Sequence, residues 1–412
     1  MIKMGDPCCP CCMSNRTPEH SHRIPITVWF LGFVSLLMDT SSEIIHSLLP
    51  VFMVTVLGVG ATTIGAIEGV AEATALITKV FSGVVSDYVG KRKWLAVMGY
   101  GLAAVTKPFF ALASSASWIF GARFIDRIGK GIRGAPRDAL VADVTPPTIR
   151  GAAFGLRQSL DTVGAFLGPL LAMGLMLLWG NNIRSVFWVA VIPAFLAIAL
   201  LVFGVREPTL TTPEKKRAFP VSRATLLKLS RTYWWVVLIG AVLTLARFSE
   251  AFLVLRALQG GLSLGLIPLV LLVMNLVYAL GAYPFGKLAD KIQHRILLIV
   301  GILPLIVADL VLAHSAQPIW LCVGLVFWGT HLAATQGLLA AMVADTAPED
   351  LRGTAFGFFN LISGLAMLIA STLAGVLWDQ LGAPATFYAG AVFSGVALLF
   401  LFVRGDNSIG IE

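Results

Sequence analysis

The chain has few charged residues for its length. Asp, Glu, Lys and Arg make up 13% of the 412 residues, which is about half the share that soluble domains carry. Hydrophobic residues make up 57%, and the mean hydropathy is +0.86. A soluble globular protein is therefore excluded, and the composition predicts a chain that lies in lipid.

Cysteine is also scarce, and four of the five cysteines crowd into a polar N-terminal tail. These are Cys8, Cys9, Cys11 and Cys12, with His20 and His22 nearby. Thiolates and imidazoles can hold a soft metal, but no standard zinc spacing is present. A reduced tail without a role in the main activity is the favoured interpretation, and any metal ligand set stays unknown.

Enzyme motifs are lacking in any usable context. We find no HExxH, GxSxG, Walker loop or strand-borne GxGxxG that could serve a reaction. No segment is long enough for the soluble output domain of a sensor, and the polar first 24 residues lack the apolar region of a signal peptide. A membrane enzyme or a sensor is thus a weaker alternative, and we expect no cofactor.

Long apolar runs are what the chain does contain. Runs of about 20 residues suffice for a helix to cross a bilayer, and their continuous apolar character excludes a membrane β-barrel. The fold class is therefore an all-α membrane protein with twelve transmembrane helices. The predicted spans are 25–57, 62–86, 94–113, 117–141, 151–178, 185–205, 233–257, 263–286, 296–314, 318–343, 354–377 and 384–403.

The basic residues fall mainly in alternate loops, so the net charge of +8 does not indicate nucleic acid. One side of a twelve-span threading holds Lys91, Arg92, Lys93 and the basic segment 206–232, whereas the other has little beyond Arg184 and Arg256. Basic loops stay in the cytoplasm. We therefore expect a multi-pass protein of the cytoplasmic (inner) membrane with both termini inside.

The chain contains an internal repeat. "VADVTPPTIRGAAFG" at 141–155 aligns with "VADTAPEDLRGTAFG" at 343–357, an offset of 202 residues. Two parallel six-span repeats around a midplane cavity are a recurring transporter architecture. The predicted organisation is a Cys-rich cytoplasmic tail at 1–24, a first half at 25–205, a linker at 206–232, a second half at 233–404 and a short cytoplasmic tail at 405–412.

The loop after the second span carries a family signature. "GVVSDYVGKRK" at 83–93 has glycine, aspartate, glycine and a basic run, and "GKLADK" at 286–291 is a weaker echo. The chain thus resembles the major facilitator superfamily (MFS) of transporters over nearly its whole length. The resemblance implies a cytoplasmic gate in which an aspartate at a helix end pairs with arginines. The implied gate residues are Gly83, Asp87, Arg92, Arg133, Arg137 and Asp290.

The fourth and fifth spans carry two further signatures. "RFIDRIGKGIRGAPRD" matches the arginine and spaced glycines of the family, with Arg127 where glycine is common. "GLRQSLDTVGAFLGP" resembles the antiporter branch, although Ala172 and Met173 replace its closing glycines. The resemblance favours efflux by exchange with protons. The expected helix-packing residues are Gly155, Gly164, Gly168 and Pro169, whose small side chains and bend also suit packing in any bundle.

Ionisable side chains inside predicted spans are costly and indicate function or pairing. Asp39, Glu43 and His46 share one helix face at i, i+4 and i+7, and Glu68 shares a face with Glu72. Neighbouring acids in a low dielectric disfavour a double charge, so one can carry a proton. The expected proton-coupling residues are Asp39, Glu43, Glu68, Glu72 and Asp161, with Glu43 and Glu72 at the centre. If these two are structural, Asp39, Asp161 and Asp309 are the next candidates. Structural ion pairs with the bases of the fourth span are the open alternative.

The second half is more apolar, and we expect it to supply contacts to the substrate. The expected cavity residues are His46, Arg123, Arg127, Arg157, Phe248, Glu250, Asn275, Tyr278, Trp328, His331 and Asn360. His331 by itself favours an interior hydrogen-bonded role over a ligand role.

The predicted function is alternating-access transport, with proton-coupled efflux of a drug-like compound or metabolite as the leading hypothesis. The expected partners are a small molecule, protons and the bilayer, and the expected state is a monomer. Transport of a metal ion or chelate and symport uptake of a metabolite stay open.

Overall fold

The computed structural model describes residues 24–89, 91–205, 207, 228–289, 291–315, 317–348 and 351–403. Within helices, the side chains at 84, 87–89 and 403 are also outside the described part. The Cys-rich tail, nearly all of the linker, the C-terminal tail, Asp290 and the side chain of Asp87 therefore lie outside the described residues.

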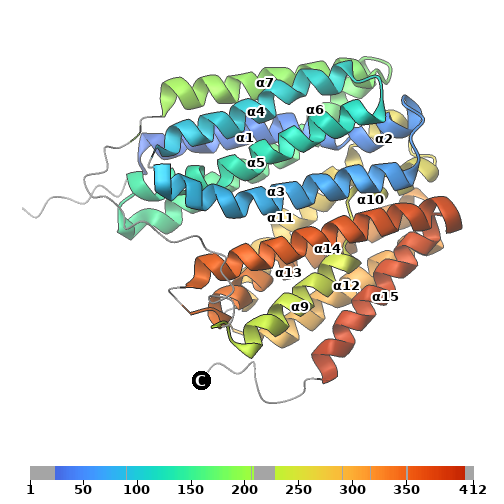
Figure 1. The fold of residues 1–412 in the computed structure, drawn as a ribbon. Helices are drawn as coiled ribbons and strands as arrows, with labels where there is room; N and C mark the ends of the chain where they lie inside the picture. The colour runs from blue at the N-terminus through green and yellow to red at the C-terminus, as the bar shows by residue number, and fades with distance from the viewer. Residues whose placement is uncertain are drawn as a thin grey trace, which may run out of the picture.

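The described chain is helical and forms two bundles of six membrane-crossing units (Figure 1). The first contains α1 (Ile26–His46), α2 (Leu49–Thr55), α3 (Ala61–Val89), α4 (Arg92–Leu112), α5 (Ala116–Val144), η1 (Pro147–Ile149), α6 (Arg150–Leu178) and α7 (Ile183–Gly204). The second contains α9 (Arg231–Ala246), α10 (Ala251–Gln259), η2 (Leu264–Leu266), α11 (Leu269–Ala289), α12 (His294–His314), α13 (Pro318–Thr346), α14 (Arg352–Leu381) and α15 (Ala383–Val403). The predicted twelve-helix membrane fold is confirmed.

Ten of the twelve units are long and apolar enough to cross a membrane by composition alone. The other two are α3 and α5, whose lengths of 29 residues suffice but which carry several charged side chains. Charges in a membrane helix face the bundle interior or a water-filled cavity. These two helices are therefore where a polar site is to be sought.

The internal repeat is visible in the helix bounds. α4 and α12 have 21 residues each, α5 and α13 have 29 each, and both pairs are offset by 202 residues. This offset pairs each position of the first half with a counterpart in the second.

Two predicted spans are interrupted, contrary to their expected continuity. α1 ends at His46 and α2 begins two residues after Ser47, with Pro50 in its first turn. α9 ends at Ala246 and α10 begins at Ala251. The breaks are counterparts in the repeat, and discontinuous helices at matching places commonly mark a transporter's binding site.

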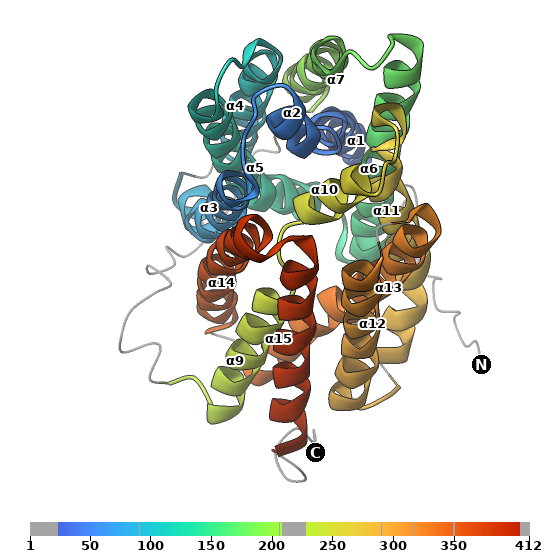
Figure 2. The same cartoon turned by 90° about the vertical axis from the view of Figure 1, so that its right-hand side faces the viewer.

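The halves meet along α3 and α14, and again where α6 lies beside α11 (Figure 2). Glycines allow the first approach: a side chain at Gly65 or Gly375 would collide with backbone of the opposite half, at Ser371 and Ala61. Contacts also join α2 to α10 and α6 to η2. We call the end that holds α2 and α10 the far end, and the end where α1 begins and α15 finishes the terminal end.

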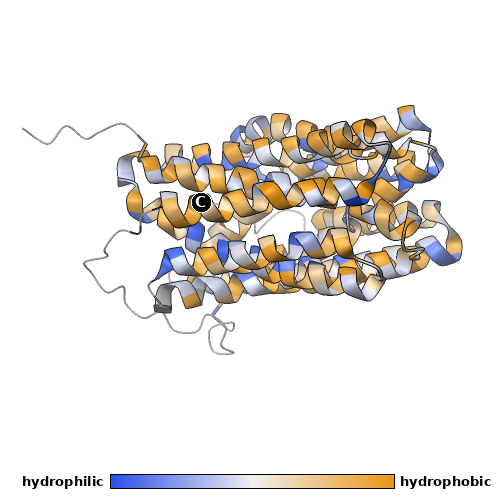
Figure 3. Ribbon diagram, turned by 90° about the horizontal axis from the view of Figure 1, so that it is seen from above, coloured by the Kyte–Doolittle hydropathy of each residue, from blue (hydrophilic) through white to orange (hydrophobic). Residues whose placement is uncertain are grey.

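Hydrophobic residues line the helices along most of their length (Figure 3). Many large apolar side chains point outward, with Phe203 at 86% and Leu178 at 78% exposure. Lipid can cover such surfaces without cost, so outward apolar residues fit a bundle embedded in a bilayer.

Candidate functional site

A cavity of about 330 Å³ lies between the two halves, next to both helix breaks. The first half contributes Glu43, His46, Glu72, Arg127, Lys130 and Ala165. The second contributes Arg247, Phe248, Ser249, Glu250, Asn275, Leu332, Gln336 and Met367. Three acids and three bases line it, so their formal charges cancel.

The break between α9 and α10 places two of these charges. Arg247 directly follows α9, and Glu250 directly precedes α10. Ser249 lies outside a helix, and its backbone N–H donates a hydrogen bond to the Ser371 hydroxyl oxygen at 3.2 Å. The non-helical segment 247–250 therefore bridges to α14 and holds Arg247, Phe248 and Glu250 at the cavity wall.

Two ion pairs join α3 to α5 beside the cavity. Arg123 makes a two-bond contact with Glu68, at 3.1 Å and 2.6 Å, and both side chains are buried. Arg127 lies 3.2 Å from Glu72, whose side chain is 30% exposed. A buried bidentate pair positions helices firmly, so Glu68 fits a structural role, whereas Glu72 faces the cavity.

Glu43 has a weaker partner. Among the described side chains its ion-pair contact is His46, with Nδ1 at 3.6 Å from the carboxylate. The other ring nitrogen lies 3.9 Å from Glu68. Gly168 of α6 leaves room for Glu43, because a side chain there would collide with it. Glu43 is thus a cavity carboxylate whose neighbour is itself titratable.

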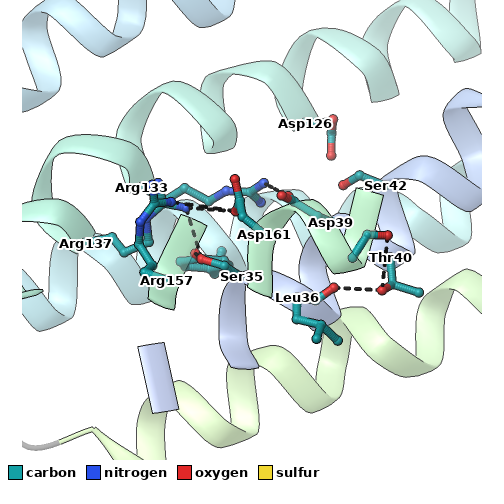
Figure 4. A network of polar contacts seen from close by, with 12 residues as sticks. Ser35, Leu36, Asp39, Thr40, Ser42, Asp126, Arg133, Arg137, Arg157 and Asp161 are labelled. Carbon is teal, nitrogen blue, oxygen red and sulfur yellow. Dashed lines mark hydrogen bonds and ion pairs between the residues drawn. The ribbon is translucent and has the colours of Figure 1, made fainter. Parts of the chain in front are cut away.

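A second charged network lies toward the terminal end (Figure 4). Arg133 lies 3.4 Å from Asp39, and Arg137 donates to the Ser35 hydroxyl at 3.1 Å. Asp161 lies 3.7 Å from both Arg137 and Arg157. The network ties α5 to α1 and α6.

Further charged pairs surround this network. Arg137 and Arg157 also contact Asp138, at 3.1 Å and 3.7 Å. Asp39 and Asp161, both predicted to couple protons, therefore lie in this network and not in the cavity lining. The predicted gate residues Arg133 and Arg137 belong to it.

Matching charged pairs lie at the same end of each half. Arg92, a predicted gate residue, contacts Asp143, and at the offset of 202 residues His294 lies 3.8 Å from Asp345. A side chain added at Gly83 of α3 would lie at an ordinary contact distance from the Ala135 side chain. Asp87 and Asp290 stay predictions for the gate.

A buried lysine and aspartate escaped the sequence predictions. Lys107 of α4 is 1% exposed and donates to Asp126 of α5 at 2.8 Å and to Ser42 of α1 at 3.1 Å. The signal was present, because a lysine inside an apolar 21-residue helix requires a partner. Asp126 lies in the charged stretch of the fourth span. Its basic neighbours in the sequence obscured its pairing with Lys107.

We expect Lys107→Met to lower the free energy of unfolding by about 3–5 kcal/mol, because it leaves Asp126 buried without a cation. The double variant Lys107→Met/Asp126→Leu should recover most of the loss. Thermal unfolding in detergent measures both. A single variant as stable as the unsubstituted protein would contradict this account of the pair.

Several predicted substrate contacts of the second half lie away from the cavity. Trp328 is fully buried against Phe248, with ring centroids 5.5 Å apart. His331 is buried with Nδ1 at 2.7 Å from the Gly301 carbonyl oxygen, which fits an interior hydrogen-bonded role. Tyr278 lines a separate space of about 240 Å³ between α11 and α13.

Asn360 also lies apart from the cavity lining, in α14. Of the first-half residues predicted for the cavity, Arg123 and Arg157 are engaged in ion pairs instead. The predicted residues that the structure brings together at the cavity are Glu43, His46, Glu72, Arg127, Phe248, Glu250 and Asn275.

The glycines of α6 act as helix contacts at two positions. A side chain at Gly164 would meet the Leu36 backbone, and one at Gly168 would meet Thr40 and Glu43 of α1. Gly155 has nothing within 4 Å. Pro169 is buried inside α6. Gly164 and Gly168 therefore set the distance between α6 and α1.

Comparison with known proteins adds a family match. A family model described as "Major Facilitator Superfamily" matches residues 29–260 and 251–409. An uncharacterised MFS-type transporter of Methanocaldococcus jannaschii is 34% identical, over 93% of this chain and 96% of that protein. A multidrug resistance protein of Proteus mirabilis is 24% identical, over 93% and 96% of the two chains. A gentisate transporter of Corynebacterium glutamicum is 25% identical, over 90% of this chain and 86% of that protein.

Solved structures share the fold. A crystal structure of a mutant nucleoside transporter superposes with a TM-score of 0.75 at 14% identity, over 92% of this chain and 98% of that one. A POT family transporter in complex with 5-aminolevulinic acid superposes with a TM-score of 0.75 at 15% identity, over 92% of this chain and 95% of that one.

Proposed function

The chain belongs to the major facilitator superfamily of transporters, and we propose that it exchanges a small, charge-bearing solute for protons across the cytoplasmic membrane. The cavity between the halves is the proposed binding site. Both halves supply charged groups to it, so rocking one half against the other changes the surroundings of the solute and of the carboxylates together.

The observation that carries the proposal is the balanced charge of the cavity. Arg127, Lys130 and Arg247 stand with Glu43, Glu72 and Glu250 around one space of about 330 Å³. Charged walls are costly in a membrane protein unless a ligand or ion uses them. Phe248 adds an aromatic face. This lining suits a polar organic solute that carries charge, with an apolar portion against Phe248.

Proton coupling is supported by the placement of Glu43. Glu72 is held by Arg127 and Glu68 by Arg123, whereas the described partner of Glu43 is a histidine at 3.6 Å. A carboxylate beside an imidazole, open to the cavity, can take up and release protons as the cavity opens and closes. Glu43 is our first candidate for the proton carrier.

Exchange, and with it export, is supported by the glycine pattern of α6 and by the name of one relative, a multidrug resistance protein. The gentisate transporter among the relatives supports an aromatic carboxylate as a solute to test. Within the described residues no group of three or more His, Cys, Asp or Glu is placed to hold a metal ion.

The test is counterflow in proteoliposomes. The panel contains gentisate, nucleosides, cationic antibiotics, dyes and a divalent metal salt. We expect labelled uptake of one charged organic class, driven by the same compound inside. Uptake of the metal salt alone, or of uncharged apolar dyes alone, would contradict the proposal.

The orientation follows from the distribution of basic residues. We propose that the terminal end is cytoplasmic, because Lys91, Lys93 and the basic linker lie there or lead from it. In a cysteine-free background, Lys215→Cys should react with a membrane-impermeant maleimide in inverted vesicles and not in intact cells. Labelling from outside intact cells would overturn this orientation.

A further inference from the structure

One buried carboxyl group has no role in the cavity or in the ion-pair networks. Asp309 of α12 has 0% exposure, and neither of its carboxyl oxygens has a hydrogen-bond partner among the described residues. No described ion pair reaches it, in contrast to the buried acids Glu68 and Asp126 of the first half. An ionised carboxylate in such a place is far more costly than a neutral acid.

The internal repeat shows how unusual this position is. Asp309 is the counterpart of Lys107, and Trp328 is the counterpart of Asp126, each at the offset of 202 residues. In the first half this pair of positions holds a direct ion pair at 2.8 Å. In the second half it holds an acid and an indole, and the indole N–H of Trp328 also has no acceptor among the described residues. The second half thus keeps the buried acid without the cation that would neutralise it.

The Phe248 ring lies near Asp309 and reaches to the cavity. A side chain at Gly390 of α15 would touch both the Asp309 carboxyl, at 2.6 Å, and the Phe248 ring, at 3.1 Å. Phe248 lies against Phe252, Phe387 and Trp328, with ring centroids 5.5–5.6 Å apart. Phe248 also lines the cavity. The Phe248 ring, carried by the non-helical segment 247–250, therefore borders both the cavity and the place where Asp309 is buried.

The charged and titratable groups on the neighbouring elements are few. The segment 247–250 carries Arg247 and Glu250, which face the cavity. α10 carries the buried Arg256, which donates to the carbonyl oxygens of Leu312 and Ala313 near the end of α12, at 2.8 Å and 3.2 Å. α13 carries His331, which is bonded to Gly301. α15 carries Tyr388, which is 48% exposed. None of these is in a described ion pair with Asp309, so no described cation offsets a charge on its carboxylate.

We propose that Asp309 is a second proton-binding site, loaded as a neutral carboxylic acid behind Phe248 and opened to the cavity when the segment 247–250 moves. The site binds a proton, and the indole N–H of Trp328, on the neighbouring helix α13, is a donor without an acceptor among the described residues. The role in transport rests on the proposed proton exchange, but the occupancy of the site does not.

Infrared spectroscopy of the full-length protein in nanodiscs reads the occupancy directly, without a transported solute. At neutral pH, the infrared spectrum of the unsubstituted protein minus that of Asp309→Asn should show the C=O stretch of one protonated carboxylic acid. Asp309→Glu should restore an acid band at a shifted position. Absence of any acid band in the difference spectrum would overturn the proposal.

Access is tested by hydrogen–deuterium exchange of the same band. Phe248→Ala should speed its exchange several-fold relative to the unsubstituted protein, whereas Phe387→Ala, the same change on a ring that does not line the cavity, should leave it nearly unchanged. Equal exchange in both variants would refute the route past Phe248. If proton-coupled transport fails and the band persists with this pattern, the site stands and the proposed function falls.

Discussion

Replacing Glu43 by Gln is expected to abolish gradient-driven accumulation of solute while leaving passive exchange measurable. The substitution keeps the shape of a residue that lines the cavity but removes the proton it would carry. Counterflow needs no net proton movement, so it should persist within a few-fold. Parallel measurements of counterflow and of uphill uptake under an imposed pH gradient give both values.

Glu72→Gln is the matched comparison, because Glu72 lines the same cavity but lies 3.2 Å from Arg127. We expect a smaller loss of coupling from it, and the double variant should resemble Glu43→Gln. Uphill transport with unchanged pH dependence in both single variants and in the double variant would show that these acids are structural. The coupling would then lie with Asp39, Asp161 or Asp309.

Replacing Asp379 by Ala is expected to open the far end of the molecule. Asp379, near the end of α14 in the second half, accepts hydrogen bonds from the backbone amides of Ala61 and Thr62, at 3.0 Å and 2.8 Å. These amides begin α3 in the first half, so the carboxylate caps a helix across the interface of the halves. A helix cap contributes about 0.5–2 kcal/mol, and about 1 kcal/mol changes a two-state ratio about fivefold.

Spin labels at Val56 and Ser263, which flank the α2 and α10 contact, report the far end by pulsed dipolar spectroscopy. The population with a long distance should grow several-fold in Asp379→Ala. Gln380→Ala, on the adjacent exposed residue, is the control and should match the unsubstituted protein. An unchanged distance distribution in Asp379→Ala would show that this cap does not hold the far end closed.

The fold was predictable because lipid imposes a strong length and composition rule on each span. Even α3 and α5, which fail a purely apolar criterion, were identified from their place between short polar breaks. The breaks after His46 and Ala246 were not predicted. Both fall inside predicted spans. Pro50 marks the first break, but Pro108 and Pro169 lie inside continuous helices, so a proline within a span does not by itself predict a break.

The candidate site was predictable in its residue types and less so in its partners. A shared helix face placed Glu43 and His46 together correctly, because that is local geometry. The same face also contains Asp39, yet Asp39 meets Arg133 one turn away. Which acid meets which base depends on the rotation and depth of separate helices, and a single sequence does not encode these in any local pattern. For the same reason Arg123 was predicted for the cavity but lies bonded to Glu68.

The central claim, that solute moves in exchange for protons, is tested most directly by proton flux in proteoliposomes. A pH-sensitive dye is trapped inside, and the panel compound that shows counterflow is added outside under a clamped membrane potential. The account predicts that the lumen becomes more alkaline as solute enters, that empty liposomes show no such change, and that Glu43→Gln removes it. Solute entry with an unchanged or acidified lumen would contradict the claim.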